Sequence, residues 1–327
     1  MHRAFVLALA LAGCDAVTAS PASQERAQAS PPAATATPEK RAASAAASLG
    51  ELAFPAPKRL VAIGDVHGDL ARTKRVLRLA GAIDEADRWV GGDLFVVQVG
   101  DQTDRGDDDR AILDMFARLR REAKAAGGTF LALNGNHELM NAALDFRYVT
   151  PGGFAAFRDV AVPPDPRLGR VPEEQRARAV AFLPGGAYAR KLAEQPIVAK
   201  VGDAVFVHGG VLPKHVDLGL EVLDKQTRAW LRGEVAAPPR GVMEEDGLVW
   251  TRNYSAAPGQ RECGDLGTVL ERLDAKQLVM GHTVQRHGMN QACGGAAWRI
   301  DVGIAEYYGG PVQALEIAEG KTRVLSE

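Results

Sequence analysis

Five short glycine-containing motifs constrain this chain more than any other feature of its sequence. They are Gly64-Asp65-Val66-His67-Gly68, Gly100-Asp101-Gln102-Thr103-Asp104-Arg105-Gly106, Gly135-Asn136-His137-Glu138, Val207-His208-Gly209-Gly210 and Gly281-His282-Thr283. Each joins glycine to aspartate, asparagine or histidine, and at least four of them directly follow a short apolar run. Functional sites of open α/β sheets lie beyond the carboxyl ends of the strands. The motifs therefore predict one site that is assembled from several strand ends.

The apolar runs alternate with amphipathic segments, which is the pattern of an α/β fold. Strands are expected at 59–63, 94–99, 129–133, 204–207 and 277–280. Helices are expected at 70–80 and between the Asp101 motif and Gly127-Gly128, where apolar residues recur on one helical face.

The segment 148–194 fits this alternation poorly. Its prolines at 151, 163, 164 and 166 would interrupt any strand, although 173–181 could be helical. We interpret the segment as an insertion near the site. Two roles remain open for it, the shaping of substrate access and a purely structural excursion.

The N-terminus has the pattern of an export signal. His2-Arg3 precedes an apolar stretch that is too short to span a bilayer, and the stretch ends in Leu11-Ala12-Gly13-Cys14. This ending resembles a bacterial lipoprotein signal, with residues 1–13 removed and Cys14 lipidated. An ordinary cleaved signal is the alternative. Residues 14–57, rich in Ala, Ser, Pro and Thr, would form a disordered tether before a catalytic domain at 58–327.

Lipid on Cys14 would anchor the protein to a membrane surface without spanning it. The expected location is periplasmic, and Asp15 after the cysteine points to the inner membrane. An oxidising compartment also permits Cys263 and Cys293 to form a disulfide near the His282 motif, with two free buried thiols as the alternative. The formal net charge of −2 and the lack of a basic block argue against a nucleic-acid partner.

The motifs, in this order and spacing, resemble the signature of the phosphoprotein-phosphatase branch of the calcineurin-like metallophosphoesterases. The resemblance extends over roughly residues 59–316. It implies an α/β fold with a central β-sandwich flanked by helices in αββα layers. It also implies two divalent metal ions, with manganese favoured and iron or zinc possible. The first ion would be bound by Asp65 and His67, both ions by a bridging Asp101, and the second ion by Asn136, His208 and His282.

The same resemblance implies roles for residues around the metal ions. His137 would be the general acid, and Asp104 would orient its imidazole. Arg105 would bind the phosphate oxygens with its planar guanidinium, or else form an ion pair within its own loop. Arg252 is the candidate for a second phosphate-binding arginine, with a surface residue packed on Trp250 or Tyr254 as the alternative.

Residues 136–149 resemble the Shewanella-like phosphatases more narrowly. Two positions depart from that branch: Leu144 stands where a glycine is usual, and Thr103 stands where a valine is usual. Arg147 would either reach the substrate or pair with Asp145.

The resemblance thus implies a metal-dependent phosphatase that hydrolyses phosphate monoesters by attack of a metal-bound hydroxide. The expected substrates are phosphoserine, phosphothreonine or phosphotyrosine in proteins. A periplasmic small-molecule or nucleotide phosphatase, similar to diadenosine-tetraphosphate hydrolases, is one alternative. An inactive lipoprotein that binds an envelope partner is another, although the intact set of metal ligands argues against it.

Overall fold

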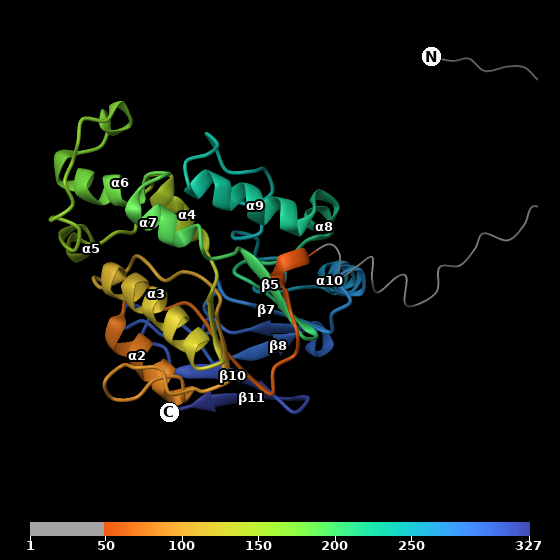
Figure 1. Cartoon of the computed structure of the whole chain (residues 1–327). Coiled ribbons are helices and arrows are strands. Elements are labelled where there is room, and N and C mark those ends of the chain that lie inside the picture. The colour runs from red at the N-terminus through yellow and green to blue at the C-terminus, as the bar shows by residue number, and fades with distance from the viewer. Residues whose placement is uncertain (1–48) are drawn as a thin grey trace, which may run out of the picture. The chain divides into compact units, whose positions relative to one another are not determined.

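The computed structural model describes residues 49–327, which form two mixed β-sheets with helices on their outer faces (Figure 1). One sheet has the strand order β11-β10-β2-β3-β4 and the other has the order β1-β5-β6-β7-β9-β8. The strands are β1 (Ala53–Phe54), β2 (Arg59–Ile63), β3 (Phe95–Gln98), β4 (Thr129–Ala132), β5 (Val198–Val201), β6 (Ala204–Val207), β7 (Gln277–Met280), β8 (Asn290–Ala292), β9 (Ala297–Arg299), β10 (Gln313–Ala318) and β11 (Lys321–Ser326).

The helices cover the outside of this pair of sheets. They are α2 (Leu70–Leu79), α3 (Asp109–Ala125), α4 (Asn136–Ala142), α5 (Pro151–Ala155), α6 (Arg176–Phe182), α7 (Ala187–Leu192), α8 (Pro213–Leu218), α9 (Leu220–Leu231) and α10 (Gln260–Arg272). Short 3₁₀ turns are η1 (Gly50–Leu52), η2 (Pro166–Leu168), η3 (Glu173–Gln175) and η4 (Cys293–Gly295).

The layers follow from alternation of side chains along the strands. In β2, Leu60 and Ala62 pack between the sheets, whereas Val61 and Ile63 pack with the side chains of α2 and α3. In β6, Phe206 faces the other sheet and Val205 packs in the cluster that contains α7, α9 and α10 residues. Both faces of each central strand are therefore buried, and the expected α/β fold with two helix-flanked sheets is confirmed.

The parallel strand pairs place the motif loops at shared sheet edges. β2 is parallel to β3, β3 is parallel to β4, and β6 is parallel to β7. The five strands expected from the sequence lie within one residue of their predicted limits, and α2 ends one residue earlier than predicted. Strands β1, β5 and β8–β11 were not anticipated.

The folded domain begins before the expected boundary at residue 58. Leu49, just before η1, and Leu52, its last residue, are buried in the core. β1 pairs with β5 through Ala53 and Phe54. The last residues of the expected tether at 14–57 are therefore part of the fold, because their apolar side chains complete the core. The proposed signal at 1–13, Cys14 and the tether up to residue 48 lie outside the described residues. Within residues 49–327, no helix is both long and apolar enough to cross a bilayer.

The segment 148–194 contains α5, α6 and α7, and no strand begins in its described residues. The helix expected at 173–181 is present as η3 followed by α6. Of these helices, α6 packs against α4, the helix that begins at Asn136 of the third motif, and α7 packs against α6 (Figure 1).

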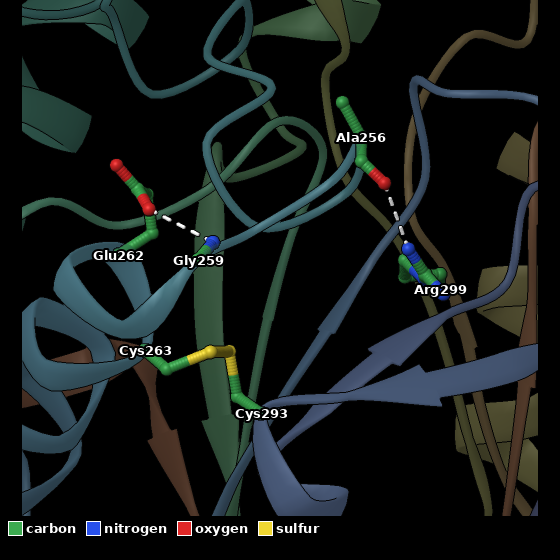
Figure 2. The surroundings of a disulfide bond; sticks show 6 residues. All are labelled: Ala256, Gly259, Glu262, Cys263, Cys293 and Arg299. Atoms are coloured by element: carbon green, nitrogen blue, oxygen red, sulfur yellow. Dashed lines mark hydrogen bonds between the residues drawn. A yellow bond between two sulfur atoms is a disulfide. The ribbon is translucent and has the colours of Figure 1, made fainter.

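A disulfide joins Cys263 in α10 to Cys293 in η4, as Figure 2 shows. Close to it, the Arg299 guanidinium in β9 donates a hydrogen bond to the Ala256 carbonyl (Figure 2). β9 pairs with β7, the strand that leads to His282. The disulfide ties α10 to η4, and the hydrogen bond ties the loop before α10 to β9. Both attach this region to the strands beside β7 and its expected metal ligand, His282.

Candidate dinuclear metal centre

Five of the six expected metal ligands lie in loops that follow strands, and the sixth, Asn136, is the first residue of α4; all six side chains are buried. They are Asp65 and His67 after β2, Asp101 after β3, Asn136 after β4, His208 after β6 and His282 after β7. Two groups of side chains could each hold an ion, with ligand atoms within 4.8 Å of one another: His67, Asp101 and His137, and Asp101, His208 and His282. Asp101 belongs to both groups, which is the position expected for a bridging carboxylate.

Three of the expected histidine ligands each donate an N–H hydrogen bond to a backbone carbonyl. The donor is the ring nitrogen that points away from the other expected ligands, here called the outward nitrogen. The acceptors are Thr103 for Nδ1 of His67 at 3.2 Å, Val99 for Nδ1 of His208 at 3.0 Å, and Trp250 for Nε2 of His282 at 2.9 Å. A carbonyl can only accept, so in each neutral ring the proton lies on the outward nitrogen. The inward nitrogen of each ring consequently presents a lone pair, as metal-binding histidines do.

The inward lone pairs face other ligand atoms that also carry lone pairs. Nε2 of His208 lies 2.9 Å from Oδ1 of Asn136, 3.1 Å from Nδ1 of His282 and 3.2 Å from Oδ2 of Asp101. Neutral rings with this tautomer have no proton to place between these atoms, so their approach is repulsive unless a cation lies among them. The side chains present therefore fit a divalent cation.

The protonation of the histidines agrees with this assignment. Burial lowers the pKa of His67 to about 4 and that of His282 to about 2, so both rings are neutral at pH 7 and able to bind a metal. Nε2 of His67 lies 3.8 Å from Oδ2 of Asp65 and 3.7 Å from Oδ2 of Asp101. Burial, followed by the charges of Asp301 and Asp101, raises the pKa of the Asp65 carboxyl. A cation between the two aspartates would relieve this repulsion.

At two motif positions, glycine is required because the backbone passes very close to a ligand carboxylate. A Cβ on Gly281 would lie 2.2 Å from Oδ1 of Asp65, and a Cβ on Gly135 would lie 2.2 Å from Oδ1 of Asp101. A larger residue at either position would displace a ligand carboxylate. The backbone is also left-handed at Asp101 and His282, with φ of 56° and 67°, which turns their side chains inward at a cost in strain.

His137 and Asp104 form the pair that the sequence predicts. Nδ1 of His137 lies 2.7 Å from Oδ2 of Asp104, and Nε2 of His137 lies 3.7 Å from Oδ2 of the shared Asp101. Burial lowers the pKa of His137, but Asp101 and the hydrogen-bonded Asp104 outweigh it and raise the pKa to about 9. Cations bound at Asp101 would cancel part of that increase. The imidazole is held so that Nε2 faces the metal ligands.

The three predicted arginines have different surroundings. The Arg105 guanidinium stacks on Tyr148, 3.9 Å from the ring centroid, and Nη1 lies 3.3 Å from the Tyr307 hydroxyl. Its buried Nε has no hydrogen-bond partner among the described residues. Arg252 donates from Nη1 to the His282 carbonyl at 2.6 Å and to the Thr283 hydroxyl at 2.8 Å.

Arg147 pairs with Asp145, with its Nη2 2.6 Å from Oδ2, and its side chain is 64% exposed. Of the two placements considered for Arg147, the structure shows the ion pair. Within residues 49–327, Arg105 makes no ion pair with its own loop, and Arg252 donates hydrogen bonds to the His282 loop.

Glu138 received no role in the sequence analysis, yet it organises the centre. One carboxylate oxygen accepts from the backbone amides of Gln102 and Thr103 at 2.8 and 3.1 Å, and the other accepts from those of Asp101 and Gly135 at 2.9 and 2.8 Å. It therefore joins the Asp101 loop to the start of α4. Its place in the motif was the available signal, but three of its four amide partners, Asp101, Gln102 and Thr103, lie in another loop.

A family model for calcineurin-like phosphoesterases matches residues 58–286. This chain is a calcineurin-like phosphoesterase. The phosphoesterase is 40% identical over 286 residues to "Shewanella-like protein phosphatase 2" of Arabidopsis thaliana, covering 77% of this chain and 73% of the relative. It is 29% identical over 264 residues to "Shewanella-like protein phosphatase 1" of Plasmodium berghei, covering 77% and 69%. The expected family, its Shewanella-like branch and a hydrolase function are confirmed.

Solved structures agree with the fold of the phosphoesterase. The structure of a cold-active protein-tyrosine phosphatase from a psychrophilic Shewanella species superposes with a TM-score of 0.68 at 23% identity, covering 84% of this chain and 82% of that one. At this identity the likeness shows the fold.

The two departures from the branch pattern have local explanations in the phosphoesterase. Leu144 follows the end of α4 with φ of 63°, a left-handed conformation that glycine adopts without strain. Thr103 donates its hydroxyl to Oε1 of Glu138 at 3.1 Å, a hydrogen bond that a valine would lack. Neither position alters an expected metal ligand.

Proposed function

We propose that this phosphoesterase is a dinuclear metal-dependent phosphatase that hydrolyses phosphate monoesters on protein side chains, with phosphotyrosine preferred. The observation that carries the proposal is the convergence of three histidine lone pairs on Asp101 and its neighbours. Neutral imidazole and amide ligands limit the negative charge of such a site, so that it can still attract a phosphate dianion.

The side chains would divide between two cations that share Asp101. Asp65, His67 and Asp101 would hold one, and Asp101, Asn136, His208 and His282 would hold the other, with manganese proposed because the ligands mix nitrogen and oxygen. Bound cations would supply Lewis-acid charge to the phosphate and a means of activating water.

The chain's own residues would supply proton transfer and phosphate binding. Nδ1 of His137 is occupied by Asp104, so its Nε2 would carry the proton that the leaving oxygen needs. Arg105 would bind phosphate oxygens, since its Nε is buried with no partner in the described part of the chain and its guanidinium stacks on Tyr148. Arg252 would add a second positive charge beside the His282 loop.

The aromatic side chains around Arg105 support the preference for phosphotyrosine. Tyr307 is 61% exposed and lies 5.1 Å from the Arg105 guanidinium, on which Tyr148 also stacks. Such rings can pack against the aromatic ring of an aryl phosphate. An alkyl phosphate has no ring for this contact. The structural relative from Shewanella is a protein-tyrosine phosphatase, which is consistent with this preference.

The test is a comparison of kcat/KM for the manganese-loaded protein. Matched phosphotyrosine and phosphothreonine peptides and a panel of nucleotides would be the substrates. We expect the phosphotyrosine peptide to have the highest kcat/KM. The highest value on nucleotides would replace the proposal with the small-molecule alternative, and no hydrolysis of any monoester would refute it.

We also propose that the protein is exported and anchored through lipid on Cys14. Support comes from the Leu11-Ala12-Gly13-Cys14 sequence and from the disulfide, a bond typical of oxidising compartments. Replacement of Cys14 by serine should release the protein from membranes. Membrane fractionation that is unchanged by this replacement would contradict the proposal.

A further inference from the structure

Arg178 of α6 is completely buried and reaches from the segment 148–194 into the catalytic loops. Its Nε donates to Oδ1 of Asn141 at 2.9 Å, and its Nη1 donates to the carbonyl of Gly153 at 2.9 Å. Its Nη2 donates to Oδ2 of Asp109 at 2.6 Å and lies 3.4 Å from Oδ1 of Asp104. One guanidinium thus bridges two carboxylates, a side-chain amide and a backbone carbonyl.

The surroundings of this charge are otherwise apolar. The guanidinium lies 4.8 Å from the ring centroid of Phe182 and 5.2 Å from that of Phe157, and both rings are fully buried. A buried ion pair seldom stabilises a protein more than well-packed apolar residues would. Stability alone therefore gives a poor account of Arg178, whereas the fixing of a particular geometry gives a better one.

The geometry that Arg178 fixes is that of Asp104. Oδ1 of Asp104 receives Nδ2 of Asn141 at 2.9 Å and faces Arg178, which leaves Oδ2 for His137. The backbone amide of Asp104 donates to Oδ1 of Asp109, the carboxylate whose other oxygen binds Arg178. Asn141 also donates to the His137 carbonyl. Arg178 or its direct partners therefore hold Asp104 at both its backbone and its side chain.

We propose that Arg178 is a positioning residue for the general acid, acting through Asp104 on the imidazole of His137. Its hydrogen-bond partners within residues 49–327 include none of the six expected metal ligands. This inference rests on the proposed function, because it assigns Arg178 to the protonation of the leaving group. It also gives the segment 148–194 a role that differs from substrate access: docking of α6 completes the acid.

A structural role for Arg178 is the competing explanation, and the leaving group distinguishes the two. An alkoxide leaves poorly without a proton, whereas a nitrophenolate leaves well without one. Loss of acid positioning therefore slows alkyl phosphates selectively, whereas partial unfolding slows all substrates in proportion.

The matched control is Arg110 in α3, which also binds this segment. It donates to the Ala156 carbonyl at 2.8 Å and the Tyr188 hydroxyl at 3.1 Å and pairs with Asp159, but it has no contact with Asp104 in the described structure. Arg110→Met should weaken the attachment of the segment without disturbing the acid.

The experiment measures kcat and KM on p-nitrophenyl phosphate and on a phosphoserine peptide for wild type, Arg178→Met, Arg178→Lys and Arg110→Met. Arg178→Met should lose about 100-fold in kcat on the phosphoserine peptide, near the contribution of a general acid, and no more than about threefold on p-nitrophenyl phosphate, with KM little changed. Arg178→Lys should recover part of the loss. Arg110→Met should affect both substrates equally.

Equal losses on both substrates in Arg178→Met would overturn the inference. If that variant does not fold, Arg178→Lys is compared in the wild-type and Asp104→Asn backgrounds. Its selectivity for the nitrophenyl ester should appear only when Asp104 is intact, and selectivity in both backgrounds would be contrary evidence.

A measurement that needs no activity separates this inference from the proposed function. The low-field proton resonance of the His137–Asp104 hydrogen bond, identified by its absence in His137→Gln, should persist in Arg110→Met and broaden or disappear in Arg178→Met or Arg178→Lys. Its persistence in the Arg178 variants would overturn the inference even if wild type hydrolysed no phosphate ester. Failure of wild type to hydrolyse any monoester would overturn only the proposed function.

Discussion

The replacement of Glu138 by glutamine tests how the metal loops are held. The carboxylate accepts four backbone amides, two at each oxygen, and Oε1 also accepts the hydroxyl of Thr103. A glutamine amide has one oxygen and one NH₂ group. Whichever way it is oriented, its NH₂ group would face two backbone N–H donors, either those of Gln102 and Thr103 or those of Asp101 and Gly135.

The cost follows from the two amides that lose their acceptor. A buried donor left without a partner costs about 1–3 kcal/mol, so Glu138→Gln should reduce the free energy of unfolding by about 2–6 kcal/mol. For a domain of this size, each kcal/mol lowers Tm by about 2–4 °C. Because two of the amides flank Asp101, the affinity for manganese should fall as well.

Thermal and urea unfolding of the metal-free protein, together with a manganese titration, would measure both effects. Glu262→Gln is the matched control, because the half-buried Glu262 accepts the amide of Gly259 at 2.9 Å, at the start of α10, and joins no second loop within residues 49–327. Its change should stay below about 1 kcal/mol. A Glu138→Gln variant as stable as the Glu262→Gln control, with unchanged manganese affinity, would refute the reasoning.

Three further predictions concern single residues. Asp101→Asn removes the shared anionic ligand and should lower both bound manganese and kcat; a metal-replete, active variant would contradict the bridging role. Leu144→Gly should exceed Leu144→Ala in unfolding free energy by about 1 kcal/mol, because φ is 63°; equal stability would argue against strain there. Burial lowers the pKa of His215 to about 4. The contribution of His215 to the free energy of unfolding is therefore complete above about pH 6.5, and about 3 kcal/mol of it should be lost as the pH falls to 4. His215→Gln should lack this pH-dependent component when unfolding is measured between these pH values.

The parts of the fold that the sequence predicts are those with local signals. β2, β3 and β6 are buried on both faces, so each reads as a mainly apolar run that leads into a glycine motif, although β3 includes Gln98. β11, by contrast, is largely exposed and carries Lys321, Thr322 and Arg323, which give no apolar run to detect. The hairpin that joins it to β10 turns at Glu319 and Gly320, both with positive φ. That turn was the available signal, and it was missed.

Metal ligands are predictable because each has to stand next to a strand end and a tight turn. Residues that support the ligands have no such local requirement, and they can be predicted only when their partner is near in sequence. Two arginines of the same region show the contrast. Arg147 pairs with Asp145, two residues away, and that pair was foreseen as one alternative. Arg178 binds Asn141 and Asp104, which are 37 and 74 residues away. In sequence Arg178 resembles the other arginines near it, and only the packing of α6 against α4 makes it a buried partner of the acid. The residues that sequence analysis misses here are thus the ones whose function depends on a contact between distant loops.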